Sequence, residues 1–176
     1  MKKLLAMVMV LMLFAVAAYA EARTREIEVE GMKEMINEER AEGNGYALYY
    51  DVDRFAFYAN GVGEGVDLLV PSSDSAVSPV YLQIRRAEGD PAAEYIADGF
   101  ADEGEVQLGD AGAPGLTARR LTASRSGVSY TAYLIPDGDG MFVLDIACAV
   151  EASEGFGARL RAAVNTFELV EPAPEA

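Results

Sequence analysis

The chain of 176 residues contains no histidine and one cysteine, and both shortages exclude common chemistry. Histidine is the most frequent general base and transition-metal ligand, so its absence rules out Ser-His-Asp and Cys-His catalysis and histidine-based zinc sites within this chain. The single cysteine, Cys148, cannot form an internal disulfide, so stability must come from the hydrophobic core. The sequence therefore predicts neither catalytic residues nor a cofactor.

Basic residues are also scarce. Fourteen lysines and arginines stand against 29 aspartates and glutamates, and the formal net charge is −15. Nucleic acids and anionic membrane surfaces are bound through Lys and Arg side chains that neutralise phosphates, so this balance disfavours both as partners. It favours a basic partner, dissolved cations or a plainly soluble surface.

An uninterrupted apolar run occurs only near the N-terminus. Two lysines precede an apolar stretch over residues 4–18, and Ala18-Tyr19-Ala20 is a pattern that signal peptidase cleaves. The run is shorter than the roughly 20 residues that span a bilayer. Residues 1–20 are therefore predicted to be a signal peptide, with no membrane span after cleavage. The residue after the cleavage site is Glu21, and the single cysteine, Cys148, lies far from it, so no lipid can attach at a new N-terminal cysteine. The protein is therefore predicted to be exported, either secreted or extracytoplasmic in the cell envelope, and not a lipoprotein.

The rest of the chain is predicted to form one domain. A chain of about 150 residues buries close to 70% of the surface that its unfolded form exposes, so residues 21–169 can form a core without further crosslinks. Two prolines interrupt the acidic end, which predicts a disordered tail over residues 170–176.

Short apolar runs between turn residues predict an antiparallel sheet. Ile27 and Val29 alternate with glutamates, which is typical of a strand. Residues 32–42 have helical spacing and composition, but the hairpin signal Asn44-Gly45 favours an edge strand that runs into a turn. Further strands are predicted over 46–50, 55–59, 66–71, 80–87, 106–108, 116–123, 128–135 and 141–150.

Two helices are expected to cover this sheet. Asp90-Pro91 is a typical N-cap and first position of a helix, and Ala92, Ile96 and Phe100 recur at intervals of four as its buried stripe. The second helix is predicted over about residues 152–165. Helices that cover an antiparallel sheet, rather than alternating with every strand, indicate the α+β class.

Several of these segments together resemble the PsbP-like fold, a superfamily that includes extrinsic photosystem proteins and a nuclear-transport factor. The resemblance extends from Arg25 to Leu169 and depends mainly on glycine turns and core aromatics. Its segments are 45–55, 80–104, 127–149 and 165–169.

The resemblance implies an antiparallel sheet packed between helices, as an α/β/α sandwich, and a module that docks on partners rather than an enzyme. No functional residue can be transferred, because the chain lacks every histidine that a metal site of the photosystem branch would use. The export signal also excludes a nuclear-transport role.

Two pairs of aspartates have the spacing of cation ligands. Asp51 and Asp53 flank one residue at the end of a predicted strand, where they could share a calcium ion or a proton. Asp137 and Asp139 resemble the start of a calcium loop whose later ligands are missing. In both places a polar turn is the simpler interpretation, and no metal ligand is assigned.

Three further motifs have structural explanations. The glycine-rich segment 61–65 lacks the lysine and the helix of a phosphate-binding loop. The pairs Arg85-Arg86 and Arg119-Arg120 fit neutralisation of acids on a sheet face, with binding of anionic groups as the alternative. Cys148 lies on the apolar face of a predicted strand with no histidine to activate it, so core packing is expected.

The densest aromatic cluster is the candidate binding site. Tyr46, Tyr49, Tyr50 and Phe55 would form a docking patch if alternate members faced outward, because tyrosine is favoured at interfaces. Placement in the core is the other interpretation.

The leading hypothesis is an exported, non-catalytic binding or assembly module that acts on a protein or cell-envelope partner. The alternative is a calcium-linked acidic domain that uses Asp51, Asp53, Asp137 and Asp139. Convergent carboxylates would favour the alternative, and an outward tyrosine patch would favour the leading hypothesis.

Overall fold

The computed structural model describes residues 22–72, 79–109 and 115–171. The predicted signal peptide, residues 1–20, lies outside the described residues, as do residues 172–176 of the predicted tail. Most described residues belong to antiparallel strands, which form two sheets with a few short helices.

The smaller sheet has four strands in the order β1-β2-β3-β11. Residues 32–42, which have both helical and strand features in the sequence, form a strand, as the hairpin signal predicted. Glu30 and Gly31 join the first two strands with φ of 55° and 73°, the backbone of a tight hairpin turn. The strands are β1 (Arg23–Val29), β2 (Met32–Gly43), β3 (Tyr46–Asp51) and β11 (Glu168–Leu169).

The larger sheet has seven strands in the order β4-β5-β6-β10-β9-β8-β7. Two of its strands are longer than the sequence predicts, because β-bulges near Tyr58 and Gly104 let glycine-rich or acidic segments continue as edge strands. The strands are β4 (Phe55–Gly63), β5 (Val66–Pro71), β6 (Val80–Glu88), β7 (Ala101–Leu108), β8 (Leu116–Arg125), β9 (Val128–Asp137) and β10 (Gly140–Ala149).

The first helix, α2 (Ala92–Ala97), is shorter than its predicted stripe. The Asp90 carboxylate accepts the backbone N–H of Ala92 at 2.8 Å, but the N-cap is Pro91, one residue later than predicted, and no side chain caps it. The predicted burial of Ile96 is wrong, since 44% of this side chain is exposed. Phe100 follows the helix and packs edge-on against Tyr95. Tyr95 and Phe100, rather than Ile96, pack on the core cluster beneath the helix.

The second helical segment changes its winding along its length. It begins as a 3₁₀ turn η1 (Val150–Ala152), continues as a π-helical turn η2 (Ser153–Gly157) and ends as α3 (Ala158–Val164). The sequence predicts a continuous helix here. Apolar spacing marks the buried face, but it does not distinguish 3₁₀, π and α winding.

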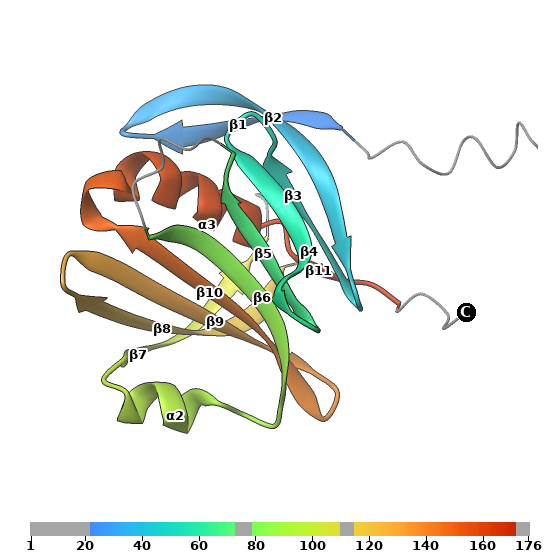
Figure 1. Ribbon diagram of the computed structural model, residues 1–176, viewed down its shortest axis with the longest axis vertical. Coiled ribbons are helices and arrows are strands. Elements are labelled where there is room, and N and C mark those ends of the chain that lie inside the picture. The colour runs from blue at the N-terminus through green and yellow to red at the C-terminus, as the bar shows by residue number, and fades with distance from the viewer. Residues whose placement is uncertain (1–21, 73–78, 110–114, 172–176) are drawn as a thin grey trace, which may run out of the picture.

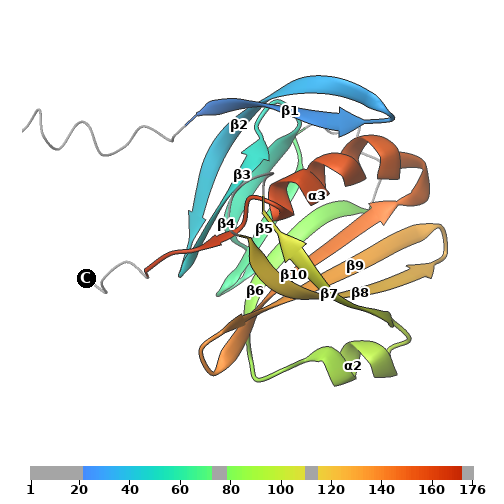
Figure 2. The same cartoon turned by 180° about the vertical axis from the view of Figure 1, so that it is seen from behind.

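The layers differ from the predicted sandwich of one sheet between helices. The large sheet does have α2 on one face and α3 on the other, but the small sheet covers the far side of α3 (Figures 1 and 2). The helix α3 packs on β1 and β3, and η2 packs on β10. The α+β expectation is therefore only partly correct, because the architecture is mainly antiparallel β. Within the described ranges, no helix is long and apolar enough to cross a membrane.

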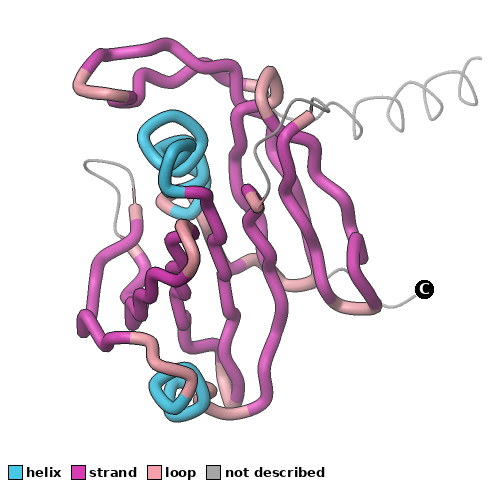
Figure 3. Tube along the Cα trace, turned by 60° about the vertical axis from the view of Figure 1, so that its left-hand side comes forward, coloured by secondary structure: helices cyan, strands magenta, loops and turns pink. Residues whose placement is uncertain are grey.

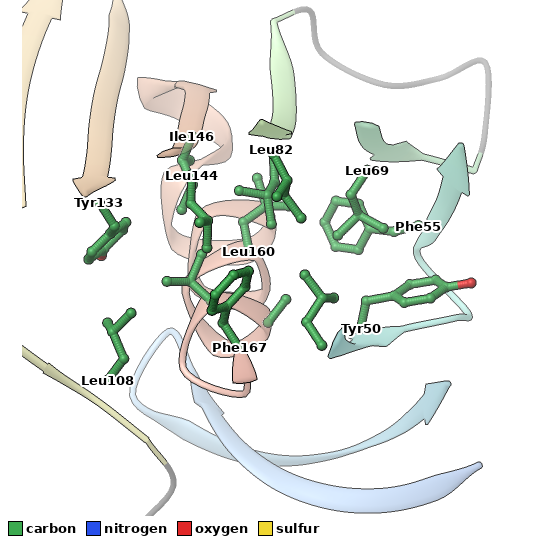
Figure 4. Packing of buried hydrophobic residues seen from close by; sticks show 14 of the residues in the cluster. Tyr50, Phe55, Leu69, Leu82, Leu108, Tyr133, Leu144, Ile146, Leu160 and Phe167 are labelled. Carbon is green, nitrogen blue, oxygen red and sulfur yellow. The ribbon is translucent and has the colours of Figure 1, made fainter. Parts of the chain in front are cut away.

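The main core lies between the large sheet and the layer formed by α3 and β3 (Figure 4). It includes Leu48, Leu82, Leu144 and Leu160, all with essentially no exposed surface. A smaller cluster packs beneath α2, and a third joins the β1–β2 hairpin to α3. Burial of this apolar area is the dominant favourable contribution to folding.

Tyr46 connects several parts of the main core. Its ring stacks on Phe167 at 5.3 Å between centroids and meets Phe142 edge-on at 5.5 Å. The ring lies so close to Gly43 that an added Cβ there would stand 2.1 Å from it. The Tyr46 hydroxyl donates to Asp67 Oδ2 at 2.5 Å, and burial raises the pKa of Tyr46. This phenol therefore stays protonated as the donor to a buried carboxylate.

Replacing Tyr46 with Phe is expected to destabilise the fold by about 1.5–3 kcal/mol, because Asp67 loses a hydrogen bond to a charged group. Urea unfolding measures the difference. Tyr58→Phe is the matched control. Tyr58 is 52% exposed and lies on β4, opposite Leu68 of β5, the strand that carries Asp67. Equal stabilities for the two variants would contradict this role of Tyr46.

Candidate functional site

A groove of about 420 Å³ lies between the tip of the β1–β2 hairpin and the π-helical turn η2. We call it the hairpin groove. Figure 3 shows the hairpin at the top, projecting over the helix. One part of the wall is apolar and the rest carries charges of both signs. The lining residues are Val29, Glu30, Met32, Lys33, Glu34, Arg54, Gly155, Phe156 and Arg159.

The hairpin is attached to α3 by its inner face. Alternation along the strands directs Ile27, Val29 and Ile36 toward the helix, where they pack with Ala162. The tip of the hairpin extends beyond this contact. Met32, directly opposite Val29 in the register, consequently keeps 66% of its surface exposed.

The opposite wall is set by the π-helical turn. Phe156 lies on this turn and its ring meets Phe55 of the main core edge-on, with centroids 5.7 Å apart. The apolar wall therefore has one adaptable member, Met32, and one fixed member. Methionine is suited to variable contacts because its side chain is unbranched and polarisable.

Arg159 joins three elements at the base of the groove. Its side chain is only 7% exposed, and Nε donates to Asp51 Oδ2 at 2.9 Å. Nη2 donates to Glu34 Oε2 at 2.6 Å, and Nη1 donates to the Gly155 carbonyl at 3.3 Å. One guanidinium thus holds α3 to the end of β3 and to β2.

Asp51 is buried, and this burial raises the pKa of its carboxyl against the opposing effect of Arg159. Its other oxygen, Oδ1, accepts the backbone N–H of Asp53 at 3.1 Å. Both oxygens therefore have partners in the protein. Asp51 acts as a structural anchor at the corner where the chain passes from β3 to β4.

Arg54 differs from the other cations of the groove. It is exposed, and among the described residues its side chain forms no ion pair. Lys33, by contrast, contacts Glu26 at 2.6 Å, which raises the pKa of the lysine. The hairpin groove therefore presents one uncommitted positive charge beside an apolar wall.

The predicted aromatic docking patch does not form as expected. Tyr46, Tyr50 and Phe55 are 2%, 8% and 2% exposed, so the docking interpretation is wrong for these three, and they belong to the core. The strand β3 is covered on both faces, whereas the patch required one open face. Only Tyr49 remains partly exposed, beneath the Arg23 guanidinium at 3.8 Å from its ring centroid.

The predicted calcium ligands do not converge. Asp51 is paired with Arg159, and Asp53 accepts a hydrogen bond from Asn37 at 2.7 Å. Asp137 forms an ion pair with Arg86 at 2.8 Å. Across residues 22–72, 79–109 and 115–171, no three acidic or thiol side chains gather in a way that could hold a metal ion.

The arginines of the pairs Arg85-Arg86 and Arg119-Arg120 contact acidic side chains of the large sheet, which agrees with the interpretation that they neutralise acids on a sheet face. All four lie within 4.0 Å of a carboxylate, although two of these contacts are 3.9 Å long. The pairs are Arg85 with Asp145, Arg86 with Asp137, Arg119 with Asp102 and Arg120 with Glu103.

Cys148 is buried in the main core, as predicted. Burial raises the pKa of its thiol, which therefore remains protonated at neutral pH. The glycine-rich segment 61–65 contains the end of β4 and the turn into β5.

The sequence contained little indication that the residues of the hairpin groove lie together. Met32 and Arg54 lie in segments separated by more than twenty positions, and only the hairpin fold brings both to η2. Arg159 did offer one clue, because it stands among the apolar residues of a predicted helix. A charged side chain in that position suggests a buried partner.

Arg159→Gln is expected to lower the free energy of unfolding by about 3–5 kcal/mol near neutral pH, because it leaves the buried Asp51 carboxylate without its counterion. Loss of Arg159 raises the pKa of Asp51 further. When folding raises the pKa of a carboxyl group, the folded protein loses stability as the pH rises from the ordinary pKa of 3.8 through the raised pKa.

The stability difference between the two proteins should therefore grow as the pH rises above 3.8. Urea unfolding of both proteins across this pH range measures it. A difference independent of pH would show that Arg159 acts through packing rather than charge.

Comparisons with known proteins concern the fold. No protein-family model matches the chain, and no curated protein matches it. Among solved structures it is similar to the solution structure of cyanobacterial PsbP (CyanoP) from Synechocystis sp. PCC 6803, with a TM-score of 0.48 and 10% identity over 76% of this chain and 92% of that chain.

A crystal structure from Bacteroides thetaiotaomicron VPI-5482 is also similar, with a TM-score of 0.46 and 12% identity. The match covers 72% of this chain and 45% of that chain, so this chain corresponds to less than half of the Bacteroides protein.

Proposed function

We propose that the protein is an exported, non-catalytic binding module that holds a segment of a protein or cell-envelope partner in the hairpin groove. The observation that carries the proposal is the combination of an apolar wall, Met32 and Phe156, with Arg54, a cation that forms no ion pair within the described part of the chain. Such a surface fits an apolar side chain that lies next to a carboxylate.

The cationic groups of the hairpin groove support binding rather than general-base catalysis. Arg159 is fixed by Asp51 and Glu34, and Lys33 is held protonated by Glu26. A general base needs a pKa near the working pH and access to the substrate proton. The two buried or paired cations do not meet this requirement, and Arg54 carries a guanidinium that stays charged.

The shape of the groove supports a short segment as its occupant. Its volume of about 420 Å³ is within the range of small-ligand and side-chain pockets. Binding would order the exposed Met32 against the incoming apolar group. The buried anchor at Arg159 keeps the opposite side in place, which limits the entropy lost on association.

Met32→Ser is expected to weaken binding of such a segment by about tenfold, because it removes apolar contact area worth roughly 1–2 kcal/mol. Peptides with free C-termini, selected from a phage-displayed library against the wild-type protein, provide the probes. Fluorescence anisotropy then gives their dissociation constants for each variant.

Met35→Ser is the matched control. Met35 is 63% exposed, close to the 66% of Met32, but its odd offset along β2 directs it to the outer face of the hairpin. The proposal requires that Met35→Ser bind the selected peptides as the wild type does. Equal weakening by both substitutions would refute it.

The export part of the proposal is supported by the two lysines, the apolar run and the Ala18-Tyr19-Ala20 pattern of the sequence. Expression of the full chain in a host with a secretion pathway should yield a protein that begins at Glu21. Intact mass spectrometry of the exported material measures this. A mass that retains residues 1–20 would contradict cleavage.

A further inference from the structure

A second polar cluster lies on the other side of α3 from the hairpin groove. It consists of Arg120 on β8, Tyr133 on β9 and Arg161 on α3, and we call it the arginine cluster. Arg120 stands directly opposite Tyr133 in the strand register, so both side chains are on one face of the sheet. That face is the inner one, because Tyr133 packs in the same core as Leu160 of α3.

Arg161 reaches the same face from the helix. Its Nη1 lies 3.3 Å from the position that a Cβ on Gly157 would take, and the Cys148 sulfur lies 3.5 Å from that position. Residues two apart on a helix point in nearly opposite directions, so Arg161 and the groove residue Arg159 face opposite sides. The arginine cluster is therefore separate from the hairpin groove.

The hydrogen-bonding groups of this cluster lack acceptors. The ring of Tyr133 is buried, and among the described residues its hydroxyl forms no hydrogen bond, so the hydroxyl is open to an incoming group. The Nε of Arg120 is buried without a partner, and Arg161 forms no ion pair with any described residue. Buried polar groups in proteins are nearly always paired. Arg120 Nε is therefore a buried donor that lacks its acceptor, and Tyr133 and the exposed Arg161 lie beside it with donors of their own.

One carboxylate lies at the border of the cluster. Glu103 Oε2 is 3.9 Å from Arg120 Nη2, while Oε1 of the same group accepts the hydroxyl of Thr122 at 3.0 Å. This long contact is to Nη2, and Arg120 Nε has no partner among the described residues. Glu103 therefore balances part of the charge of Arg120 without accepting a hydrogen bond from it.

Electrostatic effects on Tyr133 agree with this geometry. Burial raises the pKa of Tyr133, and the charges of Arg120 and Arg161 act against that rise. Both guanidinium groups thus lie within electrostatic range of one hydroxyl. In Figure 4, Tyr133 lies at the margin of the core cluster rather than at its centre.

We propose that Arg120, Tyr133 and Arg161 bind an oxyanion, the phosphate or carboxylate group of a ligand. Guanidinium groups are donors only, and their fork matches the oxygens of phosphate and carboxylate. A phenol adds a further donor of defined direction. The fold brings these donors together from β8, β9 and α3, and the hydrophobic core beneath them holds the ring of Tyr133 in place.

Inorganic phosphate and acetate are the probes for the experiment. The purified protein is titrated with each by calorimetry at constant pH and ionic strength, so that general screening is the same throughout. Arg120→Gln and Arg161→Gln should each weaken the binding of the effective anion by at least about tenfold, the effect of losing one charge-assisted hydrogen bond.

Tyr133→Phe distinguishes this site from a merely structural cluster. Because its hydroxyl has no partner among the described residues, this variant should unfold at the wild-type temperature without anion and bind the anion more weakly. Arg119→Gln is the charge-matched control, since Arg119 is the neighbour on β8 but faces away and contacts Asp102 at 2.6 Å. Its anion binding should remain as in the wild type.

The outcomes are decisive in either direction. Binding of phosphate alone identifies a phosphoryl ligand, and binding of both anions identifies the shared oxyanion chemistry. No saturable binding of either anion, or equal losses in Arg119→Gln and Arg161→Gln, would overturn the proposal. A lower unfolding temperature for Tyr133→Phe without anion would show that its hydroxyl already has a structural role and would also count against the site.

Discussion

The ion pair between Asp51 and Arg159 fixes the relation between the two sheets. Asp51 ends β3 of the small sheet, and four residues later the chain enters β4 of the large sheet. Arg159, on the helix between the sheets, contacts this corner and also reaches Glu34 on β2. Burying a charge pair carries a large desolvation cost, which is offset only when the remaining hydrogen-bonding groups are satisfied. Here the guanidinium has three acceptors and the carboxylate two donors, so the corner has one defined geometry.

A second ionic contact holds the other end of the same hairpin. Glu38, 1% exposed, accepts hydrogen bonds from Arg23 at 2.8 Å and from Arg25 at 2.9 and 2.6 Å. Arg25 also donates to the Ala162 carbonyl on α3 at 3.0 Å. Between these two ionic contacts the hairpin packs on the helix through apolar residues. Only its tip extends past the contacts, so the hairpin groove combines a fixed base with an adjustable rim.

The sequence predicted local features better than the assembly of the sheets. The strand over residues 66–71 and the burial of Cys148 were confirmed, because each depends on neighbouring residues or a simple alternation. Alternation identifies the faces of a strand, but it does not say which sheet the strand joins. The burial of Tyr46 and Tyr50 depends on long-range layering, with α3 between two sheets, and the groove likewise joins residues far apart in the chain.

The distribution of positive charge links both proposed sites. Acidic residues outnumber basic ones by 29 to 14, so an average cation has carboxylates available nearby. Among the described residues most arginines accordingly form ion pairs, and Arg125 instead lies over the Phe100 ring and bonds the Asp98 carbonyl. Arg54 and Arg161 alone in this part of the chain have no such partner. In a protein of such negative charge, a cation kept apart from every acid retains its capacity to bind an external anion. One of these arginines borders the hairpin groove and the other belongs to the arginine cluster, so the sites inferred from shape and from unmet hydrogen bonds are also the places where positive charge is free.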